Sequence, residues 1–348
     1  YDLESQVFRN GSPDDMISFS CTINYVPHEK NSKTSKEIRE FLEKVYPDDL
    51  DREYVLSLLA SYIHGQRYGE KFHIMTGSGA NGKSTIVELL EFAFGKGDFG
   101  YSGKLPVQLL TGKRTLAGSA TPELRKTKGK RLITIDEPEN NERINVGLMK
   151  QLTGDRTMQG RGLHEDTIEW ENQNKYLLSC NNLPEIPSND DGTWRRLRVI
   201  CYKSKFVDRE PENELEFKKD YTLKGKLEGW AEQFMSLLID HYWSKFVKNG
   251  MHIDEPPSVI IHTKNYQIKN DFYREFITEH LEKTESKEDR LSIKDLYEFF
   301  KTWYMESYTM KSPAKKEFKE QMAKMNIESA GFNYIMVKMK ITEKSNVV

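Results

Sequence analysis

The sequence predicts an α/β protein: a mostly parallel sheet carrying a phosphate-binding loop, flanked by an N-terminal helical segment and a C-terminal winged-helix-like domain. The first observation is a set of short apolar runs bounded by Gly, Pro and Asn, typical of strands buried on both faces of a parallel sheet. The second is a glycine-rich motif directly after the first run. The third is a pair of amphipathic helical patterns near the C-terminus. The runs lie at residues 72–75, 132–135, 176–180 and 197–202.

The length of 348 residues exceeds that of one average domain. We expect an N-terminal irregular and helical segment, an α/β core, a helical lid or linker, and a small C-terminal domain. With 37% hydrophobic and 30% charged residues, the chain can bury a core and stay in water. The chain begins with Tyr1 rather than Met, as a piece of a longer protein would. The four expected segments are residues 1–66, 67–205, 206–262 and 263–348.

Membrane and secretory locations are disfavoured by the sequence. No apolar run is long enough to cross a bilayer, and no basic-then-apolar signal opens the chain. The three cysteines are widely spaced without a CxxC pair, which disfavours disulfides and zinc and fits a reducing interior. We therefore expect a protein of the cytoplasm or of a viral replication site, with no membrane partner.

Local charge carries the only compositional argument for nucleic acid, since the net charge is −2. Between residues 104 and 131 a dense group of basic residues stands against one acid, Glu123. Such a group is either an electrostatic footprint for phosphates or a solvated face balanced by acids elsewhere. The basic residues are Lys104, Lys113, Arg114, Arg125, Lys126, Lys128, Lys130 and Arg131.

Helical periodicity marks the segments on either side of the core. One pattern follows Ser35 and a second runs over residues 55–63, while a third covers 230–238 before a linker expected at Pro256-Pro257. The apolar positions of the first pattern are Ile38, Phe41, Leu42 and Val45, and those of the third are Trp230, Phe234, Leu237 and Leu238.

The C-terminal segment 263–348 reads as helix, helix and β-hairpin. Ser292 and Asp295 predict a capping box for the first helix, and Pro313 is expected to open the second. Two short strands are expected around 331–332 and 335–341. This order is typical of a winged helix-turn-helix that binds DNA. A helical interaction domain with solvated lysines is the alternative. The lysines proposed to contact DNA are Lys315, Lys316 and Lys319.

The phosphate site has the pattern GxxxxGK[ST], between an apolar strand and an apolar-periodic helix. Its glycines let backbone N–H groups point at phosphates, and the helix N-terminus adds positive potential. Lys83 is expected to bridge the β- and γ-phosphates of ATP, and Ser84 to ligate Mg²⁺. The nucleotide-binding residues are Gly77, Ser78, Gly79, Ala80, Asn81, Gly82, Lys83, Ser84 and Thr85.

Two adjacent acids end the apolar run 132–135. Asp136 can hold Mg²⁺ through its water shell, and Glu137 can orient and deprotonate the attacking water. Two acids after a strand are also common in a polar turn without a catalytic role. The position downstream of a good phosphate loop favours the catalytic interpretation, because ligands of open α/β sheets collect at the carboxyl ends of strands.

Two further strands adjoin residues with suitable chemistry. Asn181 follows the run 176–180 and could position water or read the γ-phosphate, although Asn also favours turns. Arg195 and Arg196 precede the run 197–202 and could neutralise transition-state charge at a neighbour's nucleotide. The alternative is a salt-bridged surface pair.

The order of these motifs resembles superfamily 3 helicases, and most closely the primase–helicases of large DNA viruses, satellite phages and plasmids. The likeness covers residues 35–205 well and the C-terminal segment more weakly. Its motifs are GSGANGKST, ITIDEPE, KYLLSCNNLP and DGTWRRL, at residues 77–85, 133–139, 175–184 and 191–197.

The resemblance implies a homo-hexameric ring with an AAA+ core that moves on single-stranded and forked DNA by hydrolysing ATP with Mg²⁺. It implies Walker A roles for Lys83 and Ser84, Walker B roles for Asp136 and Glu137, a sensor role for Asn181, and an arginine finger at Arg195 or Arg196. Relatives often carry an upstream primase domain.

The resemblance also assigns a DNA-gripping β-hairpin to the stretch that holds Arg161 and His164. These two residues are expected to contact DNA or, alternatively, to stabilise the hairpin only. The chain departs from many relatives at Gly154-Asp155-Arg156, where they have Gly-Gly-Asp, so no role is assigned to Asp155.

Two other functions share the phosphate loop. One is a small-molecule kinase, which would not explain the basic stretch or the C-terminal helices. An initiator that uses ATP to assemble on DNA without unwinding it would use the same nucleotide residues, so the sequence leaves it open.

Overall fold

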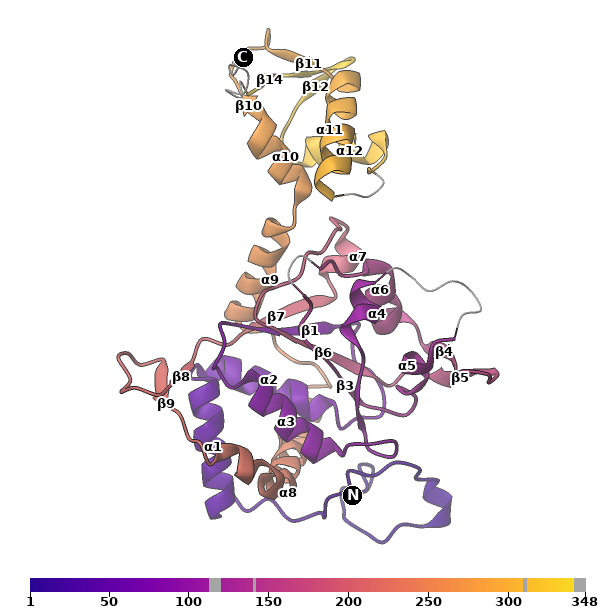
Figure 1. Ribbon diagram of the computed structural model, residues 1–348, viewed down its shortest axis with the longest axis vertical. Helices are drawn as coiled ribbons and strands as arrows, with labels where there is room; N and C mark the ends of the chain where they lie inside the picture. The colour runs from indigo at the N-terminus through magenta and orange to yellow at the C-terminus, as the bar shows by residue number, and fades with distance from the viewer. Residues whose placement is uncertain (113–119, 140–141, 309–311, 341–348) are drawn as a thin grey trace. The chain divides into compact units, whose positions relative to one another are not determined.

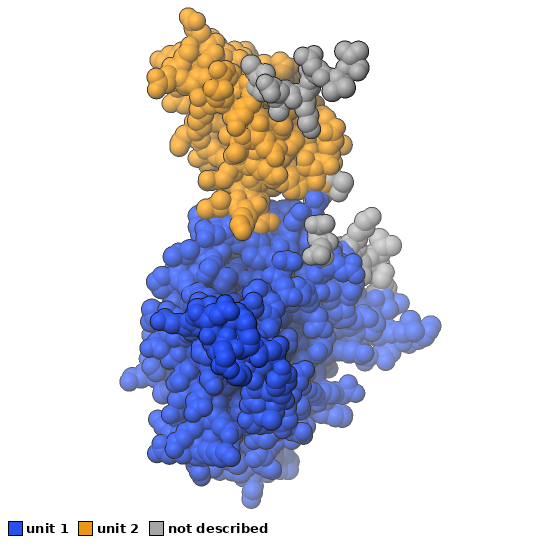
Figure 2. All heavy atoms as spheres, turned by 60° about the vertical axis from the view of Figure 1, so that its left-hand side comes forward, with its two compact units in different colours: residues 1–267 blue, residues 268–348 orange. Residues whose placement is uncertain are grey.

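The computed structural model describes residues 1–112, 120–139, 142–308 and 312–340. The chain divides into two compact units, unit 1 (Tyr1–Gln267) and unit 2 (Ile268–Val348), coloured separately in Figure 2. The three segments expected at 1–66, 67–205 and 206–262 all lie within unit 1. None of the helices in the described ranges combines the length and apolar character needed to cross a lipid bilayer.

The centre of unit 1 is a five-stranded sheet in which every pairing is parallel (Figure 1). Each of the four apolar runs forms one of its strands. The short edge strand β2 was not expected, because Ser102-Gly103-Lys104 contains no apolar side chain. In spatial order the strands are β2 (Ser102–Lys104), β3 (Leu132–Ile135), β6 (Lys175–Cys180), β1 (Phe72–Thr76) and β7 (Leu197–Cys201).

Helices cover both faces of this sheet, because successive strand residues point to opposite sides. Met75 belongs to the apolar core on one face, and Ile74 belongs to the core on the other. The first face is covered by α1 (Lys33–Val45), α2 (Asp49–Ser61), α3 (Lys83–Phe94) and α8 (Leu223–His241), as Figure 1 shows. The second face is covered by α4 (Val107–Thr111), α5 (Pro122–Arg125), α6 (Val146–Gly154) and α7 (Asp191–Trp194).

Several boundaries in unit 1 differ from the sequence expectation for local reasons. Helix α1 begins earlier than predicted, because the Ser32 hydroxyl accepts a hydrogen bond from the backbone N–H of Ser35. The segment expected to be a helical lid or linker opens with a short parallel strand pair before α8. The expected linker at Pro256-Pro257 leads directly into a helix. Pro257 is the first residue of α9 (Pro257–Lys269), where its missing N–H has no cost.

The remaining elements of unit 1 are short. An antiparallel hairpin joins β4 (Thr157–Arg161) to β5 (Thr167–Glu171), and the strand pair before α8 is β8 (Lys205–Val207) with β9 (Glu216–Lys218). A 3-10 turn, η1 (Pro13–Asp15), lies near the N-terminus, and a π-helix, η2 (Tyr242–Val247), continues α8.

Unit 2 packs helices against small antiparallel sheets around an aromatic core that includes Phe276, Phe300 and Phe318. Its described elements are α10 (Phe272–His280), β10 (Leu281–Lys283), β11 (Arg290–Ser292), α11 (Ile293–Tyr308), α12 (Lys315–Lys324), β12 (Ser329–Ala330), β13 (Asn333–Ile335) and β14 (Val337–Met339). The sheet orders are β11-β13-β12 and β10-β14.

Two expectations for unit 2 need correction. Helix α12 begins at Lys315, so Pro313 precedes the helix instead of opening it. The strand expected around 331–332 is a turn, in which Gly331 has φ of +63° between β12 and β13. The Ser292 hydroxyl does accept from the N–H of Asp295 at 3.3 Å. Ile341, the last residue of the second expected strand, lies outside the described residues.

Candidate nucleotide site

The phosphate loop follows β1 at Thr76 and ends where α3 begins at Lys83. Close packing and positive φ angles require glycine at two of its positions, Gly77 and Gly82. Gly77 has φ of +150°, and a Cβ there would lie 2.6 Å from the Tyr202 carbonyl oxygen. Gly82 has φ of +86°, and its Cβ would lie 2.8 Å from a methyl of Val45. The loop is therefore a tight cradle that side chains at these two positions would fill.

Lys83 turns its ammonium back over this loop. Its Nζ donates to the Gly77 carbonyl at 2.7 Å, to Asn81 Oδ1 at 3.2 Å and to Asn181 Oδ1 at 3.0 Å. Burial lowers the pKa of this ammonium, while Cys180 and Glu137 act in the opposite direction. A cation that has lost water and is held only by neutral oxygens is suited to receive an anion. A phosphate at the loop would restore the lost charge compensation.

The amide of Asn181 connects this lysine to Glu137. The backbone N–H and the side-chain Nδ2 of Asn181 donate to the two carboxylate oxygens of Glu137 at 2.6 and 2.8 Å. Strand β6 lies between β1 and β3, so the residues that follow these three strands meet at one edge of the sheet. The predicted catalytic residues Lys83, Asn181 and Glu137 are thus brought together by direct contacts.

The other predicted nucleotide and metal residues line the rim of the same edge. Ser84 and Asp136 are exposed, and Thr85 is half-buried. Ser78, Gly79 and Ala80 are exposed, whereas the buried Asn81 braces the loop by donating to the Ser78 carbonyl at 2.7 Å. In the described ranges no cluster of three or more His, Cys, Asp or Glu side chains is placed to bind a metal. Mg²⁺ is nonetheless suited by few protein ligands, here the Ser84 hydroxyl and the Asp136 carboxylate, together with the phosphates of a substrate.

Arg195 and Arg196 lie at the opposite edge of the sheet from Lys83. The N–H of Phe72, the first residue of β1, donates to the Arg196 carbonyl at 2.7 Å, whereas the loop follows the last residue of β1. A strand of five residues spans roughly 13–17 Å. These arginines are therefore separated from the phosphate loop of their own chain by the length of the sheet.

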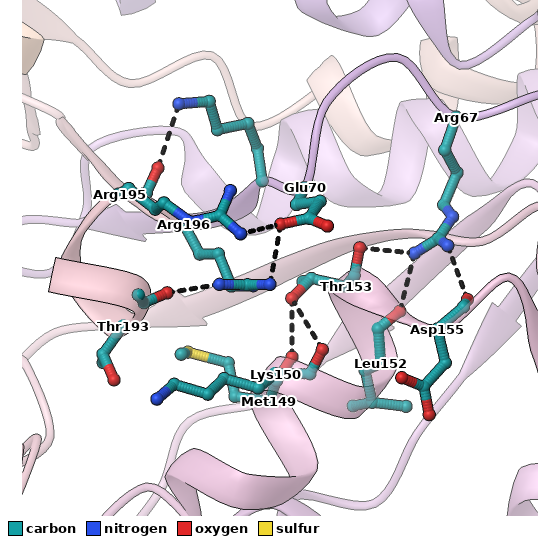
Figure 3. A network of polar contacts seen from close by, with 12 residues as sticks. Arg67, Glu70, Met149, Lys150, Leu152, Thr153, Asp155, Thr193, Arg195 and Arg196 are labelled. Carbon is teal, nitrogen blue, oxygen red and sulfur yellow. Dashed lines mark hydrogen bonds and ion pairs between the residues drawn. The ribbon is translucent and has the colours of Figure 1, made fainter. Parts of the chain in front are cut away.

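Both arginines bind the carboxylate of Glu70, a residue that sequence reasoning did not select (Figure 3). In the same segment, Arg67 donates to the carbonyls of Leu152 at 3.0 Å, Thr153 at 2.6 Å and Asp155 at 2.6 Å, at the C-terminal end of α6. Residues 67–70 thus hold both the arginine pair and the helix that leads into β4. More than 120 residues separate Glu70 from Arg195, so no local spacing could have identified it.

The hairpin stretch predicted to hold Arg161 and His164 is the β4–β5 hairpin. His164 is exposed in its turn, with φ of +58°. Arg161 is half-buried at the end of β4, where its backbone exchanges hydrogen bonds with Thr121. Asp155 precedes the hairpin as the C-cap of α6, and its side chain is exposed. The two candidate DNA residues therefore occupy different environments on one hairpin.

A groove of about 880 Å³ lies beside this hairpin, and six basic side chains line it against three acidic ones. Much of the basic stretch predicted between 104 and 131 gathers here. Lys113 and Arg114 lie outside the described residues, and Arg131 instead packs over the ring of Tyr101. The basic lining residues are Lys96, Lys104, Arg125, Lys126, Lys128 and Lys130, and the acidic ones are Glu91, Asp98 and Glu165.

In unit 2 the three candidate lysines of α12 are exposed. Lys315, Lys316 and Lys319 point away from the core, whereas Phe318 and Met322 of the same helix are buried. The helix is therefore amphipathic in the expected sense, and its basic face is available to a partner.

The chain is similar to one family model and to several viral proteins. Residues 75–196 match DUF5906, a family of unknown function. Over 330 residues the chain is 39% identical to a protein named a putative helicase in Acanthamoeba polyphaga mimivirus, covering 92% of this chain and 33% of that protein. A putative helicase of Invertebrate iridescent virus 6 is 31% identical, covering 99% and 37%. A putative primase of African swine fever virus is 24% identical, covering 88% and 32%.

A solved structure shares the fold. The A form apo structure of the NrS-1 C-terminal region aligns with a TM-score of 0.50 at 13% identity, covering 88% of this chain and 64% of that one. The chain spans about a third of the length of the curated relatives it matches. Because those relatives are viral proteins named helicases and primases, the predicted resemblance of this chain to the primase–helicases of large DNA viruses is confirmed.

Proposed function

We propose that this chain is the ATPase part of a DNA helicase, in which ATP hydrolysis on an AAA+ core drives movement along single-stranded DNA. The observation that carries the proposal is the chain of contacts from Lys83 through Asn181 to Glu137 at one edge of the sheet. A motif lysine, an amide and a carboxylate in this arrangement are suited to hydrolysing a nucleoside triphosphate. The names of the viral relatives supply DNA as the expected substrate.

Substrate binding is assigned to the loop 77–84. Its backbone N–H groups and the ammonium of Lys83 would hold the phosphates of ATP, replacing the neutral oxygens that Lys83 now contacts. Ser84 and Asp136 would hold Mg²⁺, Asp136 through water. The metal would supply charge neutralisation at the phosphates when bound.

Hydrolysis is assigned to Glu137 and Asn181. Glu137 would orient the attacking water and accept its proton. Asn181 holds both oxygens of Glu137, so it would fix the direction of that carboxylate. Asn181 would sense the γ-phosphate through the second proton of its Nδ2 group, because phosphate oxygens accept hydrogen bonds and the other Nδ2 proton is donated to Glu137.

The position of the arginines supports a ring-shaped assembly. Because Arg195 and Arg196 lie a full strand length from their own phosphate loop, they would complete the site of a second copy. Contacts between unlike surfaces generate a ring when the rotation closes, and we propose a homo-hexamer. Arg161 and His164 would then present the β4–β5 hairpin to DNA in the channel.

Two surfaces support DNA as the partner. The groove lined by six basic side chains adjoins the hairpin. In unit 2, the order helix, helix and antiparallel strands, with Lys315, Lys316 and Lys319 exposed on α12, supports a winged-helix reader of forked DNA. The relatives that are named primases support an upstream primase domain in the same polypeptide and a role at the viral replication site.

The experiment measures ATPase activity with and without single-stranded DNA, beside displacement of a strand from a fork. We expect Lys83→Ala to abolish turnover, Glu137→Gln to bind ATP without hydrolysing it, and Glu139→Gln, an exposed acid two residues away, to retain activity. An ATPase that ignores DNA would indicate a kinase. DNA-stimulated turnover without strand displacement would indicate an assembly ATPase, and turnover by Lys83→Ala would refute the site itself.

A further inference from the structure

The carboxylate of Glu70 lies between the two arginines that end the α7 segment (Figure 3). Its Oε2 atom accepts a hydrogen bond from Nη2 of Arg195 and forms an ion pair with Nη2 of Arg196 at 2.6 Å. Glu70 sits in the connection between α2 and β1, two residues before the sheet begins. One carboxylate therefore compensates two guanidinium groups and leaves the cluster with a net positive charge.

The two arginines have different environments. The side chain of Arg196 is 11% exposed, and its Nη1 donates to the carbonyl of Gly192. The side chain of Arg195 is 56% exposed and has Glu70 as its side-chain partner. Its carbonyl is fixed by Lys71 Nζ at 3.0 Å. Arg196 is thus an inner residue that packs the turn, and Arg195 is the one whose guanidinium can reach outward.

An open pocket of about 480 Å³ lies beside the cluster, and its charged lining residues are Glu70, Lys150, Asp155 and Arg196. Lys150 is itself paired with Asp190 at 2.7 Å. The pocket therefore reaches Arg196, whereas the exposed Arg195 does not line it. Both arginines lie at the edge of the sheet that faces away from the phosphate loop of the same chain.

We propose that Glu70 is a positioning residue: it holds Arg195 in the direction from which this arginine reaches the triphosphate of a second copy, while Arg196 anchors the turn. This inference rests on the proposed ATPase function. An arginine with a long, flexible side chain that is held in place before the reaction loses less entropy in the transition state. Without Glu70, Arg195 is free to rotate, and two like charges remain side by side.

The test compares Glu70→Gln with the wild-type chain in ATP turnover at saturating single-stranded DNA. Gln keeps the size of the side chain and removes its charge. We expect kcat to fall about tenfold while KM for ATP stays within about twofold, because the group acts in the transition state and not in ground-state binding. Glu70→Asp keeps the charge and is expected to recover part of kcat. Unchanged kcat in Glu70→Gln would overturn the proposal.

The matched control is Asp15→Asn. Asp15 accepts from both Nη atoms of Arg9, at 2.9 and 2.7 Å, in another ion pair of unit 1, and neither arginine of the cluster binds it. We expect Asp15→Asn to keep the wild-type kcat. An equal loss of kcat in both variants would mean that any broken ion pair in unit 1 lowers activity, and would refute a specific role for Glu70.

Mixed assemblies separate positioning in trans from a structural defect. Lys83→Ala subunits cannot turn over ATP, but they keep intact Glu70 and arginines. When they are added in excess to Glu70→Gln subunits, turnover per Glu70→Gln subunit should rise toward the wild-type value. No rise would overturn the proposal. ATP hydrolysis by the Lys83→Ala chain alone would refute the proposed function itself. If that chain is inactive and Glu70→Gln has the wild-type turnover rate, only the role proposed for Glu70 is refuted.

Discussion

His73 makes the stability of unit 1 sensitive to mild acid. It is the second residue of β1, in the middle of the sheet, and only 6% of it is exposed. Burial lowers the pKa of its imidazole to about 3, and the positive charges of Arg198 and Lys71 act in the same direction. Arg198 is its direct neighbour across the β1–β7 pairing. The folded protein therefore keeps this imidazole neutral.

The sign and size of the effect follow from proton linkage. The unfolded chain binds a proton at an imidazole pKa of about 6.5, whereas the folded chain does so only near 3. Its contribution to stability is therefore complete above about pH 6.5 and is lost as the pH falls toward 3. Between pH 7 and pH 5 the loss amounts to about 2 kcal/mol of unfolding free energy from this one residue.

The assay is urea denaturation of the wild type and of His73→Leu at several pH values, followed by tryptophan fluorescence. Other groups titrate equally in both chains. The contribution of His73 is therefore the difference between the two slopes of unfolding free energy against pH. We expect His73→Leu to lose about 2 kcal/mol less than wild type between pH 7 and pH 5. His252→Leu, which removes an imidazole that is 73% exposed, is the control for the removal of an imidazole outside the sheet. Equal slopes for wild type and His73→Leu would refute the reasoning.

Two further predictions concern the loop and the groove. Gly82→Ala places a Cβ 2.8 Å from a methyl of Val45 at φ of +86°, so we expect a loss of about 1–2 kcal/mol in stability and a raised KM for ATP. Gly79→Ala meets no atom within 4 Å and should keep the wild-type melting temperature, which a thermal scan of both variants checks. Lys126→Ala and Lys128→Ala should each weaken DNA binding and reduce the slope of log affinity against log salt by about 1.

Titration of labelled single-stranded DNA at several salt concentrations measures that slope. Lys248→Ala removes an exposed lysine of unit 1 that does not line the groove, so its slope should equal the wild-type slope. Equal slopes in all four chains would exclude the groove as a phosphate-binding surface.

The sequence by itself determined four of the five strands of the sheet and the position of the glycine-rich loop between β1 and α3. Continuous apolar runs are typical of strands that are buried on both faces of a parallel sheet. A glycine-rich turn between a strand and a helix N-terminus is typical of a loop that binds phosphate. Asp136, Glu137 and Asn181 could be selected because each follows an apolar run, and the carboxyl ends of parallel strands meet at one edge. Strand β2 could not be predicted, because its three residues have no apolar side chain.

The tertiary structure decided the contacts between distant segments. It linked Lys83 to Glu137 through Asn181, placed Arg195 and Arg196 at the far edge of the sheet, and gave both arginines the carboxylate of Glu70. The sequence left two interpretations open for these arginines, an arginine finger or a salt-bridged pair. The structure shows the salt bridges with Glu70, and these do not exclude the role of an arginine finger. The physical reason is that strand order and helix packing, rather than spacing along the chain, determine which polar groups share one edge of a sheet.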